Sequence, residues 1–513
     1  MLVKTFGYAV QGINATKVTV EVSIGVGVNF FMVGLPDNAV KESQQRIDSA
    51  LKHIGYKIPG KQITVNMAPA DIRKEGSAYD LTIALGILAA SEQIQSDLMA
   101  DYVIMGELAL DGEIRPIKGS LPIAIAAKKD GFKGIILPEQ NSAEAAVVKG
   151  LDVLYANNIK QLIDFFNQKE VLPKAEINLE EIFLNQSNEI EFDFADVKGQ
   201  ENIKRAMEIA AAGGHNVILI GPPGAGKTML SKRLPSILPP LTFEEALETT
   251  KIHSVASRGG IKINGLVTQR PVRTPHHTIS DIALVGGGNN PQPGEISLAH
   301  NGVLFLDELP EFKRAVLEVM RQPIEDRVVT ISRAKLSVEY PASFMLIASM
   351  NPCPCGYYNH PEKDCVCAPG IVQKYLNKIS GPLLDRIDLH IEVTPVPFGE
   401  LSKQHSSEKS ADIRARVIKA RDIQNLRYKN ENKIHCNAQM RSSDIKKYCQ
   451  LNDASNALLK NAMERLGLSA RAYDRILKVA RTIADLENST NIETNHIAEA
   501  IQYRSLDREG WAG

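Results

Sequence analysis

The stretch that decides the fold is a glycine-rich octapeptide, Gly221-Pro222-Pro223-Gly224-Ala225-Gly226-Lys227-Thr228. The apolar run at residues 217–220 predicts a short buried strand before it, and residues 229–234 predict the start of a helix after it. A strand, a loop of the pattern GxxxxGK(S/T) and a helix, in that order, are typical of a P-loop. The alternative is a glycine turn that precedes a Lys-Thr pair by chance, and the flanking strand and helix argue against it.

The residue types of this loop fit phosphate binding. Glycines let backbone N–H groups curl around phosphate oxygens, and the positive end of the following helix points at them. Lys227 is placed to reach the β- and γ-phosphates, and Thr228 to offer a hydroxyl to Mg²⁺. We therefore expect the chain to bind ATP together with Mg²⁺ through residues 221–228.

Length and composition bound the remaining possibilities. A chain of 513 residues is too long for one ordinary core, so we expect three domains. Because the net charge is −1, any contact with nucleic acid must come from local patches. No apolar run is long enough for a membrane helix, and the first residues are too interrupted for a signal peptide. We therefore expect the six cysteines to lie in a reducing cytoplasm, where metal binding is favoured over disulfides.

Two further apolar runs end in polar residues that complete an ATP-hydrolysing site. Residues 302–306 (Gly-Val-Leu-Phe-Leu) lead into Asp307 and Glu308, at the carboxyl end of a predicted strand, where ligands bind in parallel sheets. Asp307 is typical of a Mg²⁺ ligand, and Glu308 of the group that polarises the attacking water. Residues 344–350 end at Asn351, which we expect to hold that water. The alternative for Asn351 is a turn residue before Pro352.

Two arginines are candidates for contacting the γ-phosphate. Arg386 lies in the sequence Leu-Leu-Asp-Arg-Ile-Asp, and we expect it to act on the phosphate of a neighbouring subunit. Its alternative is an ion pair within the chain, with Asp385 or Asp388. Arg471 opens a predicted helix in the last domain and is expected to contact ATP of its own subunit. Arg475, one turn later, is expected to be solvated.

Four cysteines follow Asn351 as two close pairs, Cys353 with Cys355 and Cys365 with Cys367. Four thiolates can form a tetrahedral Zn²⁺ site, although one intervening residue within each pair is tighter than usual. His360 is an alternative ligand, and free thiols or a redox pair are alternatives to the metal. We expect a structural zinc site here, and ordinary thiols at the two isolated positions, Cys436 and Cys449.

The first part of the chain, residues 1–170, has an α+β pattern. It is expected to contain strands at 17–23, 62–66 and 134–137, helices at 37–54, 81–90 and 120–129, and a hairpin over 102–117 that turns at Asp111-Gly112. Residues 67–78 and 106–117 resemble the proteolytic domain of Lon proteases. That family uses a Ser–Lys dyad; Ser77 lies beside the nucleophile position, but the lysine position falls near Leu121, and Lys118 is out of register. Without a base, a serine hydroxyl is a poor nucleophile, so the resemblance implies a Lon-like fold without peptidase activity.

Together the motifs resemble those of AAA+ ATPases of the magnesium-chelatase and minichromosome-maintenance branch. With the Lon-like front part, nearly the whole chain resembles the YifB/ComM family of magnesium-chelatase-like competence proteins. The resemblance implies a hexameric ring that couples ATP hydrolysis to strand exchange or branch migration of DNA in recombination or natural transformation. Two other classes stay open: an ATP-dependent protease of Lon type, and a chelatase-like ATPase subunit that remodels a protein partner.

The expected architecture is α/β. It comprises a Lon protease-like (ribosomal S5 domain 2-like) domain at 1–170, a linker at 171–192, an AAA+ core at 193–399 and a helical lid at 400–513. Helices in that lid are expected at 411–428, 455–466, 472–486 and 494–503.

Contacts with DNA are expected from one hairpin. Residues 327–340 predict a hairpin whose tip carries Arg333 and Lys335, and in the resembled branch such a hairpin points into the ring's channel. Residues 401–450 hold 12 Lys/Arg against 5 Asp/Glu, which a solvated helix face explains as well as DNA contact does. The pair His276 and His277 has no partner ligands in sequence, so we predict no metal there.

Overall fold

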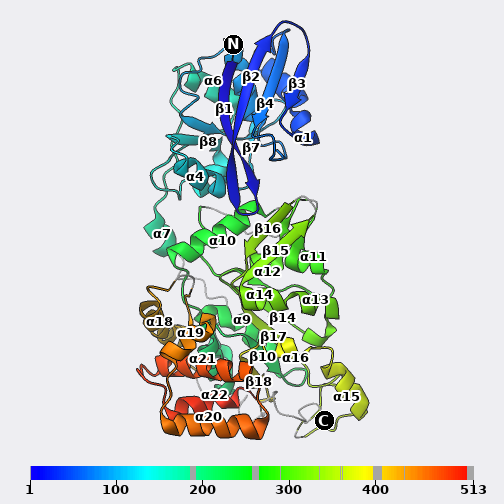
Figure 1. Cartoon of the computed structure of the whole chain (residues 1–513), viewed down its shortest axis with the longest axis vertical. Coiled ribbons are helices and arrows are strands. Elements are labelled where there is room, and N and C mark those ends of the chain that lie inside the picture. Colours follow the sequence, from blue (N-terminus) through cyan, green and yellow to red (C-terminus); the bar gives the residue numbers. More distant parts are fainter. Residues whose placement is uncertain are drawn as a thin grey trace.

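A computed structural model describes residues 2–184, 192–256, 265–288, 290–333, 336–358, 360, 362–396, 407–431 and 434–504. The molecule is elongated (Figure 1). The part before residue 170 occupies one end, the part that carries the P-loop lies in the middle, and the helices of the last hundred residues lie at the other end.

The N-terminal part is built on a mixed seven-stranded sheet, as an α+β pattern predicts. Its strands, in spatial order, are β3 (Phe30–Val33), β4 (Gln62–Ala68), β2 (Asn14–Gly25), β1 (Leu2–Gln11), β5 (Tyr102–Ile104), β8 (Gly134–Pro138) and β9 (Asp152–Ala156). The long strands β1 and β2 pair antiparallel over their whole length, from Leu2 opposite Ser23 to Gln11 opposite Asn14. Their turn therefore projects far beyond the rest of the sheet (Figure 1).

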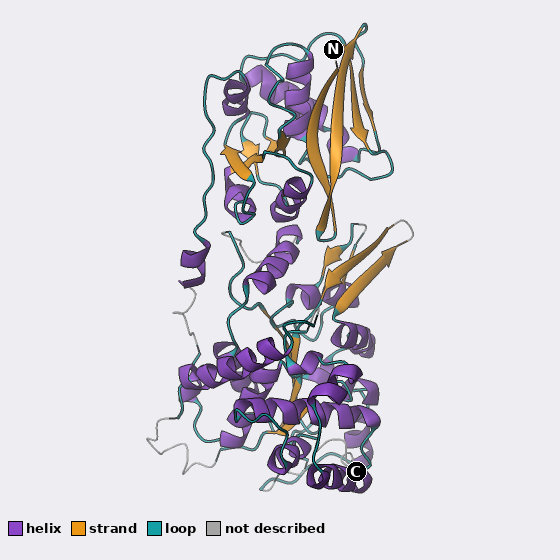
Figure 2. Cartoon of the chain, turned by 60° about the vertical axis from the view of Figure 1, so that its left-hand side comes forward, coloured by secondary structure: helices purple, strands orange, loops and turns teal. Residues whose placement is uncertain are grey.

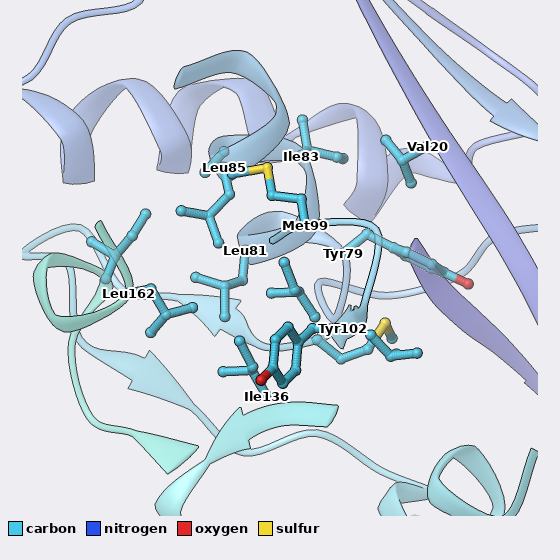
Figure 3. Packing of buried hydrophobic residues seen from close by; sticks show 14 of the residues in the cluster. Val20, Tyr79, Leu81, Ile83, Leu85, Met99, Tyr102, Ile136 and Leu162 are labelled. Carbon is cyan, nitrogen blue, oxygen red and sulfur yellow. The ribbon is translucent and has the colours of Figure 1, made fainter. Parts of the chain in front are cut away.

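Helix α3 (Asp80–Ala90) forms the centre of this part, because every one of its residues is buried. Apolar side chains from this helix, such as Leu81 and Leu85, pack among Met99, Tyr102 and Ile136 (Figure 3). Its first residue, Asp80, is buried and is neutralised by Arg46, whose Nε donates to Oδ2 over 2.7 Å. The remaining helices of this part are α1 (Asn38–Lys41), α2 (Ser43–His53), α4 (Ser120–Lys129), α5 (Glu139–Ala145) and α6 (Ile159–Phe166).

Two local predictions for this part were wrong. The single helix expected at 37–54 is two helices, α1 and α2, which meet at Glu42. The hairpin expected over 102–117 is much shorter, because β5 is recruited into the main sheet beside β1. Only β6 (Glu107–Leu108) and β7 (Ile114–Arg115) pair across the Asp111-Gly112 turn. For β5, the pairing with β1 overrides the local pattern.

The middle part is a parallel sheet of five strands, in the order β11, β14, β17, β10, β18. These are β11 (Val272–Arg273), β14 (Val303–Leu306), β17 (Met345–Met350), β10 (Val217–Ile220) and β18 (Leu389–Glu392). The last four are mostly apolar and, except for Glu392 at the end of β18, buried, as parallel strands covered on both faces must be. Because β10 lies beside β17, which itself pairs with β14, three predicted functional segments end at one edge of the sheet.

Separate apolar clusters cover the two faces of this sheet. On one face, Val217 and Leu219 pack with α8 (Glu201–Gly213) and with the C-terminal helices. On the other, Ile218 and Ile220 pack with the segment that contains α12 (Glu295–Leu298), η3 (Leu309–Glu311), α13 (Arg314–Val319), α14 (Arg321–Asp326), α15 (Pro369–Leu376) and α16 (Gly381–Leu384). The P-loop helix is α9 (Lys227–Ile237).

The C-terminal part is helical, as predicted. It contains α18 (Ser410–Arg427), η4 (Asn437–Gln439), α19 (Ser442–Tyr448), α20 (Asp453–Leu466), α21 (Ala470–Leu486) and α22 (Thr494–Gln502). Ile476 and Ile483 of α21 belong to the same apolar cluster as Val217 of β10. The helices therefore share a core with the sheet.

Among the described residues, the contacts between the N-terminal part and the middle part include the following two. Near the β1–β2 turn, the backbone of Gly12 approaches Val338 so closely that a Cβ there would lie 2.5 Å from Val338 Cγ1. Val338 belongs to the hairpin of β15 (Val328–Arg333) and β16 (Leu336–Pro341). Elsewhere, the N–H of Gly119 donates to the carbonyl of Ser254 at the end of α10 (Phe243–Val255) over 3.0 Å.

The predicted linker begins as an extended segment along one side of the molecule and includes the short helix α7 (Leu179–Leu184) (Figure 2). Among the residues that the structure describes, no helix combines the length and apolar character that crossing a bilayer requires.

Candidate nucleotide site

The octapeptide lies between β10 and α9, the strand and helix that its sequence context predicts. Gly224 (φ 78°) and Gly226 (φ 89°) have left-handed backbones that favour glycine. At Gly221 the limit is space, since a Cβ would lie 2.2 Å from the carbonyl oxygen of Val393. The loop is also held from outside, because the amide of Gln200 donates to the carbonyl of Ala225 over 3.1 Å.

Lys227 is the first residue of α9, and its ammonium points back over the loop. Nζ donates to the carbonyls of Gly221 (2.7 Å) and Pro222 (2.9 Å) and to Oδ1 of Asn351 (3.0 Å). Burial lowers the pKa of this ammonium, while Asp307 and Glu308 act in the opposite direction. These three acceptors of the Lys227 ammonium are all oxygen atoms, so phosphate oxygens can take their place.

Thr228 and Asp307 come together as the sequence predicts. The Thr228 hydroxyl donates to Oδ2 of Asp307 over 2.8 Å. The other oxygen, Oδ1, accepts the N–H of Glu308 over 3.1 Å and the hydroxyl of Ser349. A hydroxyl beside a carboxylate fits the oxygen ligands that Mg²⁺ prefers. Ser349 was missed by the sequence reasoning; the available signal was a polar residue inside an apolar strand, two positions before Asn351.

Glu308 has an unusual backbone and an exposed side chain. Its φ of 55° is rare outside glycine, and its side chain is 60% exposed. Oε2 lies 3.7 Å from Nδ1 of His277. His277 in turn stacks on His276, with ring centroids 4.1 Å apart. The sequence predicts no metal at this pair and gives it no other role, whereas the structure places His277 beside the carboxylate expected to act on water.

The two candidate arginines contact residues outside the P-loop. Arg386 donates to the carbonyl of Pro382 over 2.7 Å and to the carboxylate of Glu325, and its side chain is only 10% exposed. Arg386 therefore forms an ion pair within the chain, but its partner is Glu325 and not Asp385 or Asp388. Arg471 is 57% exposed, and its Nη1 lies 3.7 Å from Asp385.

Arg475 corrects another expectation, since it is not a solvated surface residue. Its Nη1 bonds to Oδ1 of Asp388 over 2.8 Å, and the Asp388 side chain is fully buried. The other oxygen, Oδ2, accepts the N–H of Asn216 over 2.8 Å and lies 3.6 Å from His215 Nδ1. This network ties the start of β10 to the C-terminal helix α21.

The four clustered cysteines lie together just beyond Asn351. Their sulfur atoms all lie within 4.8 Å of one another, and the pairs measured are 3.3 Å (Cys353–Cys355), 3.7 Å (Cys353–Cys365) and 3.6 Å (Cys355–Cys365). The backbone N–H of Tyr357 lowers the pKa of the Cys355 thiol. The set can hold a metal ion. His360, the alternative ligand, instead accepts the N–H of Glu362 at its Nδ1 over 3.0 Å.

The Lon-like residues line a cavity of about 1150 Å³ between the N-terminal and middle parts. Ser77, Glu107 and Lys118 lie on its wall, together with Arg333 from the β15–β16 hairpin. The hydroxyl of Ser77 donates to Glu107. At the expected lysine position, Leu121 is fully buried.

The predicted DNA-contacting hairpin forms as β15 and β16, with Ser332 opposite Ser337 and Arg333 opposite Leu336. Arg333 is exposed at the end of β15. Lys335 lies outside the described residues, as do residues 401–406 of the basic segment.

Three family models match the chain. The one described as magnesium chelatase, subunit ChlI, matches residues 193–401; subunit ChlI of Mg-chelatase matches residues 18–141; and magnesium chelatase, subunit ChlI C-terminal, matches residues 407–504. Together they cover the P-loop, the N-terminal part and the C-terminal helices.

Among curated proteins, the chain is 45% identical over 505 residues to competence protein ComM of Haemophilus influenzae, covering 98% of this chain and 97% of that protein. It is also 45% identical over 506 residues to YifB of Escherichia coli, covering 98% of this chain and 96% of that protein. Lon protease 2 of Bacillus subtilis is 28% identical over 155 residues, which are 30% of this chain and 27% of that protein. The chain therefore belongs to the YifB/ComM family of magnesium-chelatase-like AAA+ proteins, and part of it is similar to a Lon protease.

Proposed function

We propose that this chain hydrolyses ATP at the P-loop and uses the energy to remodel branched DNA. The observation that carries the ATPase role is the meeting of three strand ends: Lys227 follows β10, Asp307 follows β14 and Asn351 follows β17. Hydrogen bonds connect Lys227 to Asn351 and Thr228 to Asp307.

Each residue has a distinct task in the proposed reaction. The N–H groups of residues 221–228 and the Lys227 ammonium bind the phosphates. The phosphate oxygens then replace the carbonyls of Gly221 and Pro222 as hydrogen-bond acceptors of Lys227. Thr228 and Asp307 hold Mg²⁺, which neutralises charge on the phosphates when bound. Glu308 accepts a proton from the attacking water, and Asn351 orients that water.

We further propose that the site is completed in an oligomeric ring, with six subunits as the working model. Arg386 then leaves Glu325 and contacts the γ-phosphate held by its neighbour, where a positive charge stabilises the transition state. Arg471, exposed at the start of α21, contacts the nucleotide of its own chain. Glu325 acts in this scheme as a resting partner that keeps the Arg386 charge neutralised.

Support for DNA as the partner comes from similarity and from Arg333. The relative from Haemophilus influenzae is named a competence protein, and competence is the capacity of a cell to take up DNA. A DNA replication licensing factor of Schizosaccharomyces pombe is 21% identical over 417 residues, which are 74% of this chain and 49% of that protein. Arg333, exposed at the hairpin end, is placed to contact backbone phosphates. We therefore propose helicase-type branch migration, in the cytoplasm.

For the four cysteines we propose zinc as the metal. A tetrahedral site with Zn–S bonds of about 2.3 Å has sulfur atoms about 3.8 Å apart. The measured distances of 3.3 to 3.7 Å need only a slight expansion to accept the ion.

The second candidate function is that of a chelatase-like ATPase subunit, which the three matching family models favour. In that role the ring remodels a protein partner and DNA has no effect. A Lon-type protease activity is disfavoured, because this chain has Leu121 where the catalytic lysine is expected. Peptide cleavage by the wild type that Ser77→Ala abolishes would support the protease function after all.

The test is conversion of a fluorescent four-way DNA junction into two duplexes by the purified protein with ATP and Mg²⁺. We expect ATP-dependent conversion by the wild type and none by Lys227→Ala. Arg333→Ala should weaken junction binding and leave ATP hydrolysis without DNA unchanged. Hydrolysis that proceeds normally while the junction stays intact at every salt concentration would contradict the DNA role and favour the chelatase-like one.

A further inference from the structure

The segment between β17 and α15 is a long connection with no regular structure of its own. Among the described residues of 351–368 there is no helix or strand. Connections longer than about 12–15 residues without secondary structure are uncommon in compact domains, and they need another source of order. The four clustered cysteines all belong to this segment, two near each of its ends.

This segment begins at the catalytic candidate Asn351. Its side-chain oxygen accepts a hydrogen bond from the Lys227 ammonium over 3.0 Å. Its backbone N–H lies close enough to the phenol of Tyr375 in α15 to oppose the rise that burial causes in the pKa of that phenol. Cys353 follows two residues later and is fully buried. The segment that contains the cysteines therefore starts and ends at elements that contact Asn351.

The same segment also touches the P-loop. Gly356 (φ 86°) packs on Pro223 so closely that a Cβ would lie 2.4 Å from Pro223 Cδ. The N–H of Gly356 donates to the Cys353 sulfur over 3.2 Å, a contact that orients a thiolate ligand. No larger residue fits at position 356 without displacing the loop that binds phosphate.

The P-loop has supports that do not involve these cysteines. Gln200 bonds to Ala225 and to the carbonyl of Thr394, and Gly221 is wedged against Val393. Asn351 directly follows the last residue of β17 and is the first residue of the cysteine segment. A loosened cysteine segment should therefore displace Asn351 more than it displaces the phosphate-binding amides.

We propose that a zinc ion bound by Cys353, Cys355, Cys365 and Cys367 positions Asn351 for hydrolysis, so that the metal is needed for ATP turnover and not for ATP binding. The inference rests on the proposed ATPase role of Asn351. A bound ion would join the two ends of the segment and would thereby fix the backbone between β17 and α15. The cysteines and their metal act through Asn351, and are positioning groups.

The experiment compares wild type, Cys365→Ala, Asn351→Ala and the double variant, without DNA. Zinc is counted by mass spectrometry, nucleotide affinity is measured with a fluorescent ATP analogue, and kcat is measured separately. Replacement of zinc by Co²⁺ gives an independent readout, because a tetrahedral Co²⁺ tetrathiolate has characteristic visible absorption. Cys449→Ala removes a buried thiol outside the cluster and is the matched control.

We expect about one zinc per chain in wild type and Cys449→Ala, and its loss in Cys365→Ala. Cys365→Ala should lower kcat about tenfold or more while the affinity for the ATP analogue changes less than about threefold. The double variant should be no slower than Asn351→Ala, because both changes remove the same function. Retained nucleotide affinity also shows that the variant is folded.

The proposal would be overturned by a wild type without zinc, by loss of zinc with unchanged kcat, or by losses that multiply in the double variant. Equal losses of affinity and kcat would also overturn it, since the metal would then support the whole site. A wild type that binds zinc but never hydrolyses ATP would instead contradict the proposed function, and with it the turnover role, while the zinc count would still establish the metal site.

Discussion

The ammonium of Lys227 donates a hydrogen bond to the side-chain oxygen of Asn351 over 3.0 Å. These residues are separated by 124 positions in sequence and follow neighbouring parallel strands, β10 and β17. The bond connects the residue expected to bind phosphate with the residue expected to hold water. The bond therefore joins the carboxyl ends of β10 and β17 in one candidate site.

Replacing Lys227 should abolish nucleotide binding. Each charge-assisted hydrogen bond to phosphate contributes about 1.5–3 kcal/mol, so Lys227→Ala should weaken ATP affinity by more than tenfold. Equilibrium binding of a fluorescent ATP analogue measures this. Lys232→Ala, at an exposed position of the same helix, is the matched control and should bind normally. Unchanged affinity in Lys227→Ala would refute the P-loop assignment.

Glu308→Gln should separate binding from hydrolysis. The amide keeps the shape of the side chain but cannot accept a proton, so kcat should fall about 10²–10⁴-fold with ATP affinity preserved. Single-turnover hydrolysis together with the binding assay distinguishes the two effects. Glu311→Gln changes another partly exposed glutamate in the turn that follows, which pairs with Lys378, and should leave kcat unchanged. A Glu308→Gln protein with normal turnover would remove the proposed base.

Arg386 and Glu325 allow a test of whether the arginine is structural or catalytic. If Arg386 acts on a neighbour's phosphate, Arg386→Ala should bind ATP but stop turnover, whereas Glu325→Gln should turn over ATP at or above the wild-type rate. If the ion pair only stabilises the fold, both variants should lose the same amount of activity.

Mixing the two kinds of inactive subunit extends this test. A ring of Arg386→Ala and Glu308→Ala chains contains some sites that combine an intact Glu308 with an intact neighbouring Arg386. Partial activity should therefore return in mixtures, with a maximum at intermediate ratios. The absence of rescue at any ratio would argue against a site shared between subunits.

Asp388 should contribute to stability in a pH-dependent way. Burial alone would raise its pKa, but Arg475, His215 and the N–H of Asn216 outweigh burial and hold the pKa of this carboxyl far below its ordinary value. Removing one partner of such a pair costs about 3–5 kcal/mol. Asp388→Asn should thus lower the apparent free energy of unfolding in urea by several kcal/mol near pH 7.

The sign of the pH effect follows from the depressed pKa. The carboxylate stabilises the fold fully above its unfolded pKa of about 3.9, and this stabilisation is lost as the pH falls below that value. The difference between wild type and Asp388→Asn should therefore be constant from pH 5 to 7 and shrink below about pH 4. Asp385→Asn, in a more exposed ion pair with Arg471, should cost no more than about 1 kcal/mol. A difference that grows on acidification would contradict this account.

The edge of the five-stranded sheet was predictable because its signals are local. A Gly-rich loop before Lys227, two carboxylates after a buried strand and an amide after another each have a recognisable pattern within ten residues. The order of the strands then brings them together. The clustering of the four cysteines was likewise readable from their spacing.

Other contacts had no local signal. Arg386 pairs with Glu325, which is 61 positions away, and Arg475 pairs with Asp388 across 87 positions. Nothing around these residues distinguishes a buried ion pair from a solvated charge. The hairpin of β6 and β7 was predicted too long for a related reason. Whether β5 belongs to the hairpin or to the main sheet depends on its pairing with β1, which is distant in sequence.

The most direct test of the central claim is the steady-state rate of ATP hydrolysis measured alone, with duplex DNA and with a four-way junction. We predict a basal rate that Lys227→Ala eliminates and a several-fold stimulation by the four-way junction that exceeds the effect of duplex DNA. A rate that is the same with and without every DNA, in a protein that binds and hydrolyses ATP, would contradict it.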